Sequence, residues 1–86
     1  MAPVKSNIRI YSTKTCPYCV KAKTFLSREG FTFEEVDLTD RPDEIEKIKT
    51  RTGHRTVPLI FVDEKFVGGY TDMMSQIQSG DLVLQR

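Results

Sequence analysis

Several features that define large classes of protein are scarce in this sequence. Two cysteines among 86 residues are too few for a scaffold of structural disulfides. No apolar run approaches the roughly 20 residues that span a bilayer, and residues 1–10 lack the apolar stretch of a signal peptide. Thirteen basic residues against twelve acidic ones leave a net charge of +1. That balance gives no electrostatic footprint for duplex nucleic acid or an anionic membrane, so we expect neither as a partner.

The overall composition is that of a small globular domain. Hydrophobic residues make up 38% of the chain and charged residues 29%, which is ordinary for a folded protein and unlike a disordered segment. A chain of this length buries about 60–65% of its unfolded surface, enough for a small core. We therefore expect one cytoplasmic domain over residues 1–86, without a repeat, linker or low-complexity segment.

Apolar spacing in the first half of the chain alternates between strand and helix. A short alternating run over 8–11 predicts a strand, and the spacing over 17–29, with proline in the first turn, predicts a helix. A second strand is expected over 31–38, although its apolar residues are out of phase and leave its register open. A second helix is predicted over 42–52, with acids in its first turn and Gly53 as its stop.

The second half of the chain predicts a hairpin and a last helix. The continuous apolar run 57–62 is typical of a buried strand, and 63–65 fits a tight turn into a fourth strand at 66–67. Thr71 is expected to cap a third helix that stops at Gly80. The resulting order predicts an α/β domain in which three helices flank a mixed four-stranded sheet.

The stretch Cys16-Pro17-Tyr18-Cys19 lies where the first strand leads into the first helix. Cys16 is placed at the helix N-terminus, where unpaired N–H groups and the positive end of the helix dipole favour a thiolate, and Lys14 adds a positive charge nearby. Cys19 lies one turn further in, less exposed and close enough to attack a mixed disulfide on Cys16. This asymmetry predicts Cys16 as the nucleophile and Cys19 as the resolving thiol.

Two other interpretations of the cysteine pair are disfavoured. Structural zinc takes four ligands, and only His54 remains as a further nitrogen ligand, so we expect no metal. A pair of inert core cysteines is disfavoured because cysteines that flank a proline at a helix start are poorly placed for burial. His54 is otherwise interpreted as a loop histidine, and Lys47, Lys49 and Arg51 as a solvated helix face.

Together with two further motifs, this stretch resembles the glutaredoxin family, and within it the small dithiol type of bacteria. The resemblance runs from about residue 8 to residue 77 and is carried by Cys16-Pro17-Tyr18-Cys19, Thr56-Val57-Pro58, and Gly68-Gly69 followed by Thr71-Asp72. It implies a minimal thioredoxin-like fold. It also implies a monomeric, glutathione-dependent thiol–disulfide oxidoreductase that acts on disulfide-containing or glutathionylated proteins.

The same resemblance implies a glutathione site beside the thiols. A cis bond between Val57 and Pro58 would turn the Val57 backbone toward the nucleophile, free to pair with an extended peptide. The start of the third helix would receive the γ-glutamyl carboxylate, and Asp72 its ammonium. Lys14 and Arg55 are alternative partners for the glycine carboxylate. The expected glutathione-binding residues are Lys14, Tyr18, Arg55, Thr56, Val57, Pro58, Gly69, Tyr70, Thr71 and Asp72.

Two related functions stay open as alternatives. A redoxin that donates electrons to ribonucleotide reductase is disfavoured by Thr71 and Asp72, which preserve a glutathione corner. A carrier of a glutathione-ligated iron–sulfur cluster between two chains is disfavoured by Pro17 and Tyr18, because cluster-binding relatives usually have a smaller residue after the first cysteine. Thioredoxin itself is disfavoured because the sequence has no tryptophan.

Overall fold

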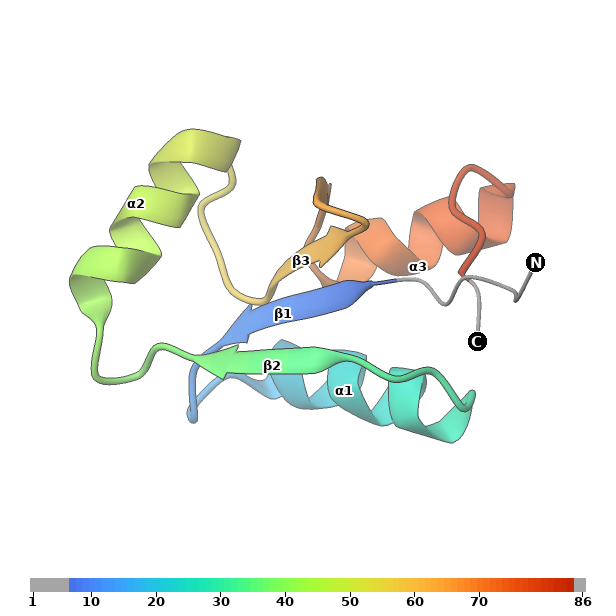
Figure 1. The fold of residues 1–86 in the computed structure, drawn as a ribbon, viewed down its shortest axis with the longest axis horizontal. Helices are drawn as coiled ribbons and strands as arrows, with labels where there is room; N and C mark the ends of the chain where they lie inside the picture. Colours follow the sequence, from blue (N-terminus) through green and yellow to red (C-terminus); the bar gives the residue numbers. More distant parts are fainter. Residues whose placement is uncertain (1–6, 85–86) are drawn as a thin grey trace.

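The computed structural model describes residues 7–84 (Figure 1). Its strands and helices follow one another in the predicted order. The elements are β1 (Ile8–Ser12), α1 (Pro17–Arg28), β2 (Glu34–Asp37), α2 (Pro42–Thr52), β3 (Leu59–Val62), β4 (Lys65–Gly68) and α3 (Tyr70–Ser79).

The four strands form one mixed sheet in the order β2-β1-β3-β4. β1 pairs with β2 in parallel, whereas β3 is antiparallel to both β1 and β4. The β3–β4 hairpin turns through Asp63 and Glu64, whose φ angles of 52° and 69° are those of a two-residue turn that matches the twist of a hairpin. The predicted fold class is confirmed.

α1 and α3 cover one face of the sheet and enclose the core. Every second residue of β1 points to this face, so that Ile8 and Ile10 are buried against Leu26 of α1 and Met73 of α3. α2 lies apart, at the end of the sheet where β1 and β2 finish (Figure 1), and none of its residues is buried. α2 therefore does not pack over the chain segments that lead into α1, β3 and α3, and these segments are available to form a site.

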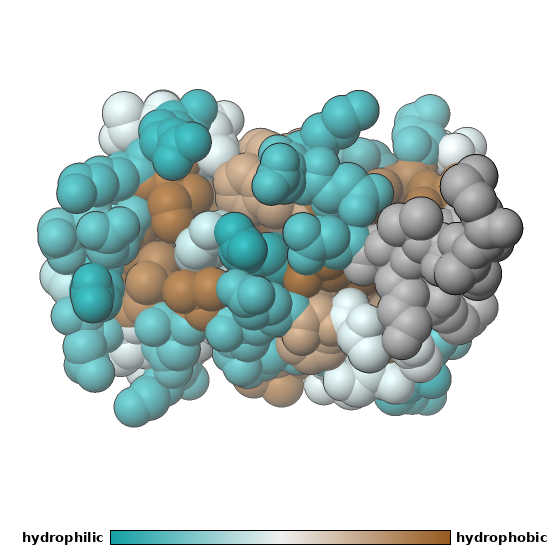
Figure 2. Space-filling model, in the orientation of Figure 1, coloured by the Kyte–Doolittle hydropathy of each residue, from teal (hydrophilic) through white to brown (hydrophobic). Residues whose placement is uncertain are grey.

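The surface on the α2 side is predominantly polar. Figure 2 shows hydrophilic side chains separating small apolar patches near α2 and across the middle of the sheet. No helix within residues 7–84 combines the length and the apolar character needed to cross a membrane.

The second strand is shorter than predicted, because residues 31–33 lie outside it. Phe31 and Phe33 are half-buried and pack against the core from the connection after α1. The Phe31 N–H donates to the Leu26 carbonyl at 2.9 Å and so belongs to the end of the helix. The phase conflict in the sequence arises because these two aromatic residues are not part of the strand.

The third strand begins at Leu59 rather than at residue 57. Leu59 pairs with Tyr11, one residue before β1 ends at Ser12. Beyond it, Pro58 has no N–H to donate to β1, and Val57 lies past the end of that strand. Val57 and Pro58 instead form a loop with a cis peptide bond between them, as the family resemblance implied.

Candidate active site

Cys16 is the residue that caps the N-terminus of α1. Its Sγ accepts the Cys19 N–H at 3.1 Å and, as a thiol, donates to the Val57 carbonyl at 3.4 Å. The first contact favours a thiolate, whereas the second requires a protonated sulfur, since a carbonyl can only accept. Cys16 therefore lies between a helix terminus and the Val57–Pro58 loop, next to exposed surface.

Cys19 lies on the core side of the same helix turn and is fully buried. Burial, together with the hydrogen bond to Cys16, raises the pKa of the Cys19 thiol to about 12. Both cysteines are unpaired thiols in this structure. The difference in exposure, 9% for Cys16 against 0% for Cys19, has the predicted direction, and the two catalytic roles stay predictions.

The expectation that these positions are poorly placed for burial is wrong. α1 packs flat on the sheet, which buries Cys19, and the Val57–Pro58 loop covers most of Cys16. Proline at the first helical position does not prevent the burial of either cysteine, because it leaves the start of the helix intact. The contacts that bury the cysteines come from the sheet and from the Val57–Pro58 loop.

A groove of about 630 Å³ lies between the Val57–Pro58 loop and the start of α3. Cys16 does not line it but contacts Val57, which does. Nine of the ten predicted glutathione-binding residues line it, contributed by α1, the loop before β3, and α3. The full lining is Tyr18, Lys49, His54, Arg55, Thr56, Val57, Pro58, Gly69, Tyr70, Thr71 and Asp72.

One side of the groove is aromatic. The rings of Tyr18 and Tyr70 lie 6.2 Å apart between centroids, and the ammonium of Lys21 sits 5.0 Å from the centroid of Tyr18. Tyr18 is 52% exposed. The two rings give the groove an apolar surface against which the stem of an extended peptide can pack.

The start of α3 differs from the prediction that Thr71 caps it. The N-cap is Gly69, and Asp72 in the first turn accepts the Gly69 N–H through Oδ2 at 3.0 Å. Thr71 is therefore already helical. Gly68 makes this arrangement possible, because its φ is +126° and a Cβ there would lie 2.6 Å from Asp72 Oδ2. The lack of a side chain at Gly68 thus leaves room for the Asp72 carboxylate at this corner.

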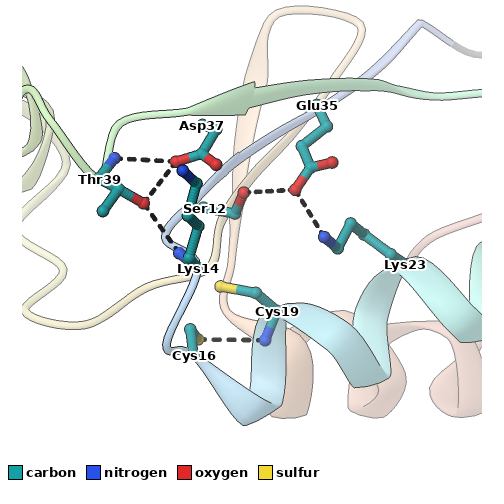
Figure 3. Close-up of polar contacts among 8 residues, drawn as sticks. All are labelled: Ser12, Lys14, Cys16, Cys19, Lys23, Glu35, Asp37 and Thr39. Carbon is teal, nitrogen blue, oxygen red and sulfur yellow. Dashed lines mark hydrogen bonds and ion pairs between the residues drawn. The ribbon is translucent and has the colours of Figure 1, made fainter.

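Lys14 is the one predicted binding residue that does not line the groove. Its N–H donates to Thr39 Oγ1 at 2.9 Å, and its side chain extends toward Asp37 (Figure 3). The sequence placed Lys14 near the cysteines correctly, but the direction of its side chain depends on the loop after β2.

Lys49 and His54 also line the groove. The interpretation of Lys49 as part of a solvated helix face is therefore wrong, and His54 is a loop histidine that contributes to the lining. Lys49 is half-buried, only 27% exposed in its side chain, and lies 3.9 Å from Glu46. Lys49 follows Ile45 by four residues and so lies on the inner face of α2. This spacing in the sequence could have predicted its position. His54 packs edge-on to Phe66 at 5.5 Å and contacts Thr56 Oγ1 through Nε2 at 3.3 Å, neither of which the sequence reveals.

Comparison with known proteins identifies the family. The glutaredoxin family model matches residues 8–67. Glutaredoxin 3 of Escherichia coli K12 is 38% identical over 77 residues, which cover 90% of this chain and 93% of that protein. The chain belongs to the glutaredoxin family. Membership identifies it as a thiol–disulfide oxidoreductase, in agreement with its Cys16-x-x-Cys19 motif.

Solved glutaredoxin structures share the fold. The solution structure of a Brucella melitensis glutaredoxin superposes with a TM-score of 0.76 at 34% identity, covering 90% of this chain and 84% of that one. A buckwheat glutaredoxin–glutathione complex gives a TM-score of 0.80 at 26% identity, covering 90% and 73%. The minimal thioredoxin-like fold expected of this glutaredoxin is confirmed.

Proposed function

We propose that this glutaredoxin uses glutathione to reduce protein disulfides and mixed disulfides between proteins and glutathione. Cys16 is the nucleophile and Cys19 the resolving thiol. The observation that carries the proposal is the groove beside Cys16, because its lining offers a partner for each polar part of glutathione. The buckwheat glutaredoxin bound to glutathione supports the choice of ligand.

The γ-glutamyl end of glutathione carries one ammonium and one carboxylate. The N-terminus of α3 suits the carboxylate, because its first N–H groups and the helix dipole favour an anion. The Asp72 carboxylate suits the ammonium, and its Oδ2 is held in place by the Gly69 N–H. A zwitterionic end group therefore matches this corner better than a simple anion would.

The remaining parts of glutathione match other segments of the lining. The Val57 carbonyl contacts Cys16 Sγ, so a peptide paired with the Val57 backbone would have its own sulfur next to the nucleophile. The glycine carboxylate has two candidate cations in the groove, Arg55 and Lys49. Arg55 is one of the two partners expected from the sequence, and Lys49 takes the place of the other, Lys14, which lies outside the lining.

The reaction then follows from thiol–disulfide exchange. The Cys16 thiolate attacks the glutathione sulfur of a mixed disulfide, the substrate leaves as a thiol, and a second glutathione frees Cys16. With a protein disulfide, Cys16 becomes attached to the substrate, and Cys19 displaces it by forming the Cys16–Cys19 disulfide. Glutathione subsequently reduces that disulfide.

A coupled assay tests this function. Glutathione and glutathione reductase should sustain turnover of a small glutathione mixed disulfide, and Cys16→Ser should abolish it. Turnover sustained by a flavoprotein thioredoxin reductase, with none from glutathione, would contradict the proposal and favour the alternative of a redoxin electron donor.

A further inference from the structure

Burial of Cys19 conflicts with the role proposed for it. A thiolate is the attacking form of cysteine, yet burial raises the pKa of Cys19 to about 12. At pH 7 a thiol with that pKa is ionised in only about one molecule in 10⁵. A group that stabilises the thiolate would therefore speed any step in which Cys19 attacks.

A charged cluster lies beside Cys19, on the sheet side of α1 (Figure 3). Lys23 follows Cys19 by one helical turn and so projects from the same face of α1. Its Nζ donates to Glu35 Oε2 at 2.6 Å, and the Ser12 hydroxyl donates to the same oxygen at 2.7 Å. Figure 3 shows the Cys19 side chain on the sheet side of α1, the side on which these three residues meet.

The strands hold this cluster firmly. Glu35 is opposite Ile10 in the parallel register, so its side chain lies on the face that α1 covers. Ser12 is only 1% exposed and lies on the same face, two residues further along β1. The Lys23 and Ser12 hydrogen bonds lower the pKa of Glu35, which therefore stays a carboxylate at neutral pH.

The other charges near Cys19 are few among the described residues. Asp37 of β2 is held by the Thr39 hydroxyl and N–H, which lower its pKa, with the charges of Lys14 and Lys23 as smaller contributions. Cys16 opposes ionisation of Cys19, whereas a backbone hydrogen bond to Thr13 and, to a smaller extent, the Lys23 ammonium favour it. The thiol thus has one cation close to it on its own helix, and Glu35 holds that cation in place.

We propose that Lys23, held by Glu35, is a positioning residue for the resolving step, in which its ammonium stabilises the thiolate of Cys19 as Cys19 attacks the mixed disulfide on Cys16. The inference rests on the proposed function, because it assigns a partner to Cys19 in that reaction.

The step balances without a further reagent. The Cys19 thiol releases its proton to solvent, and the electron pair of its thiolate forms the Cys19–Cys16 bond. The bond between Cys16 and the substrate sulfur breaks, and the substrate leaves as a thiolate that takes up a proton. The cysteine pair is oxidised by two electrons as the substrate disulfide is reduced. Lys23 keeps its own proton throughout.

Stopped-flow reaction with one equivalent of 5,5′-dithiobis(2-nitrobenzoate) separates the two thiols. Attack by Cys16 releases the first thionitrobenzoate, and attack by Cys19 on the mixed disulfide releases the second. In Lys23→Met the second phase should be about threefold slower at a given pH below 9, with its pH profile displaced upward by about one unit. A pKa higher by about one unit makes the thiolate about tenfold scarcer but about threefold more nucleophilic. Lys23→Arg should restore both the rate and the pH profile.

Lys47→Met is the matched control, because it removes an exposed lysine that also pairs with a glutamate, Glu44, but lies on α2. The free energy of unfolding is measured for every variant, and Lys23→Gln replaces Lys23→Met if the latter does not fold. An unshifted pH profile in the Lys23 variants, or a slower phase that Lys23→Arg does not restore, overturns the proposal. A wild-type protein that releases only one thionitrobenzoate contradicts instead the resolving role of Cys19 in the proposed function.

Discussion

Asp72 has two roles in this account that a pair of substitutions can separate. Its Oδ2 accepts the Gly69 N–H at 3.0 Å and so stabilises the start of α3, and its charge is proposed to bind the ammonium of glutathione. Asp72→Asn keeps an oxygen that can accept from Gly69 but removes the charge. Asp72→Ala removes both.

The two effects differ in size. Loss of a negative charge in the first turn of a helix costs about 0.3–1 kcal/mol of unfolding free energy. Loss of a charge-assisted hydrogen bond to the ligand costs about 1.5–3 kcal/mol, equivalent to about 10- to 100-fold in the apparent KM for glutathione. Asp72→Asn should therefore raise that KM strongly while leaving the protein folded, and Asp72→Ala should raise it similarly with a further loss of stability of about 1 kcal/mol.

The assay is glutathione-dependent turnover of a mixed disulfide, with unfolding in urea measured in parallel. Asp43→Asn is the control, because Asp43 lies in the first turn of α2 and is exposed. It should lose a similar fraction of stability and keep the KM for glutathione. If Asp72→Asn has the KM of the wild type, the carboxylate acts only on the helix, and the proposed ammonium site is wrong.

Two further predictions concern the glycine corner and the buried thiol. Gly68→Ala places a Cβ within 2.6 Å of Asp72 Oδ2 at a φ of +126°, so it should cost about 1–3 kcal/mol in urea unfolding and raise the KM for glutathione as Asp72 is displaced; an unchanged KM would contradict the close contact. The pKa of Cys19 is raised from 9.0 to about 12, so its contribution to stability is complete below about pH 9 and is lost as the pH rises toward 12. Across that range the reduced wild type should lose more unfolding free energy than Cys19→Ser, and parallel curves for the two proteins would contradict the raised pKa.

The order of elements was predictable because each one has a local signal. Proline in the first turn of α1 and α2, and left-handed glycines after α2 and α3, mark helix ends that need no tertiary information. In the same way, the continuous apolar run of β3 indicated a buried strand. Where local signals compete, the prediction was wrong: Thr71 is a good capping residue, but Asp72 bonding back to Gly69 starts the helix earlier.

The parts of the site that the sequence did not predict depend on contacts between distant segments. The burial of Cys16 needs the Val57 loop, 41 residues away. The turning of Lys14 toward Asp37 needs the loop that carries Thr39. The cluster beside Cys19 joins β1, α1 and β2 through Ser12, Lys23 and Glu35. No period or motif within a single element specifies such contacts.

Cys19→Ser tests the central claim most directly, because it separates the two reactions. Removal of glutathione from a mixed disulfide needs one thiolate, whereas release of a protein substrate from Cys16 needs a second thiol nearby. Cys19 lies one helical turn away, so its effective concentration exceeds that of millimolar glutathione. With a glutathionylated peptide and a disulfide protein as substrates, the variant should keep the first reaction and lose most of the second. Equal loss of both reactions would contradict the assignment of Cys16 as nucleophile and Cys19 as resolving thiol.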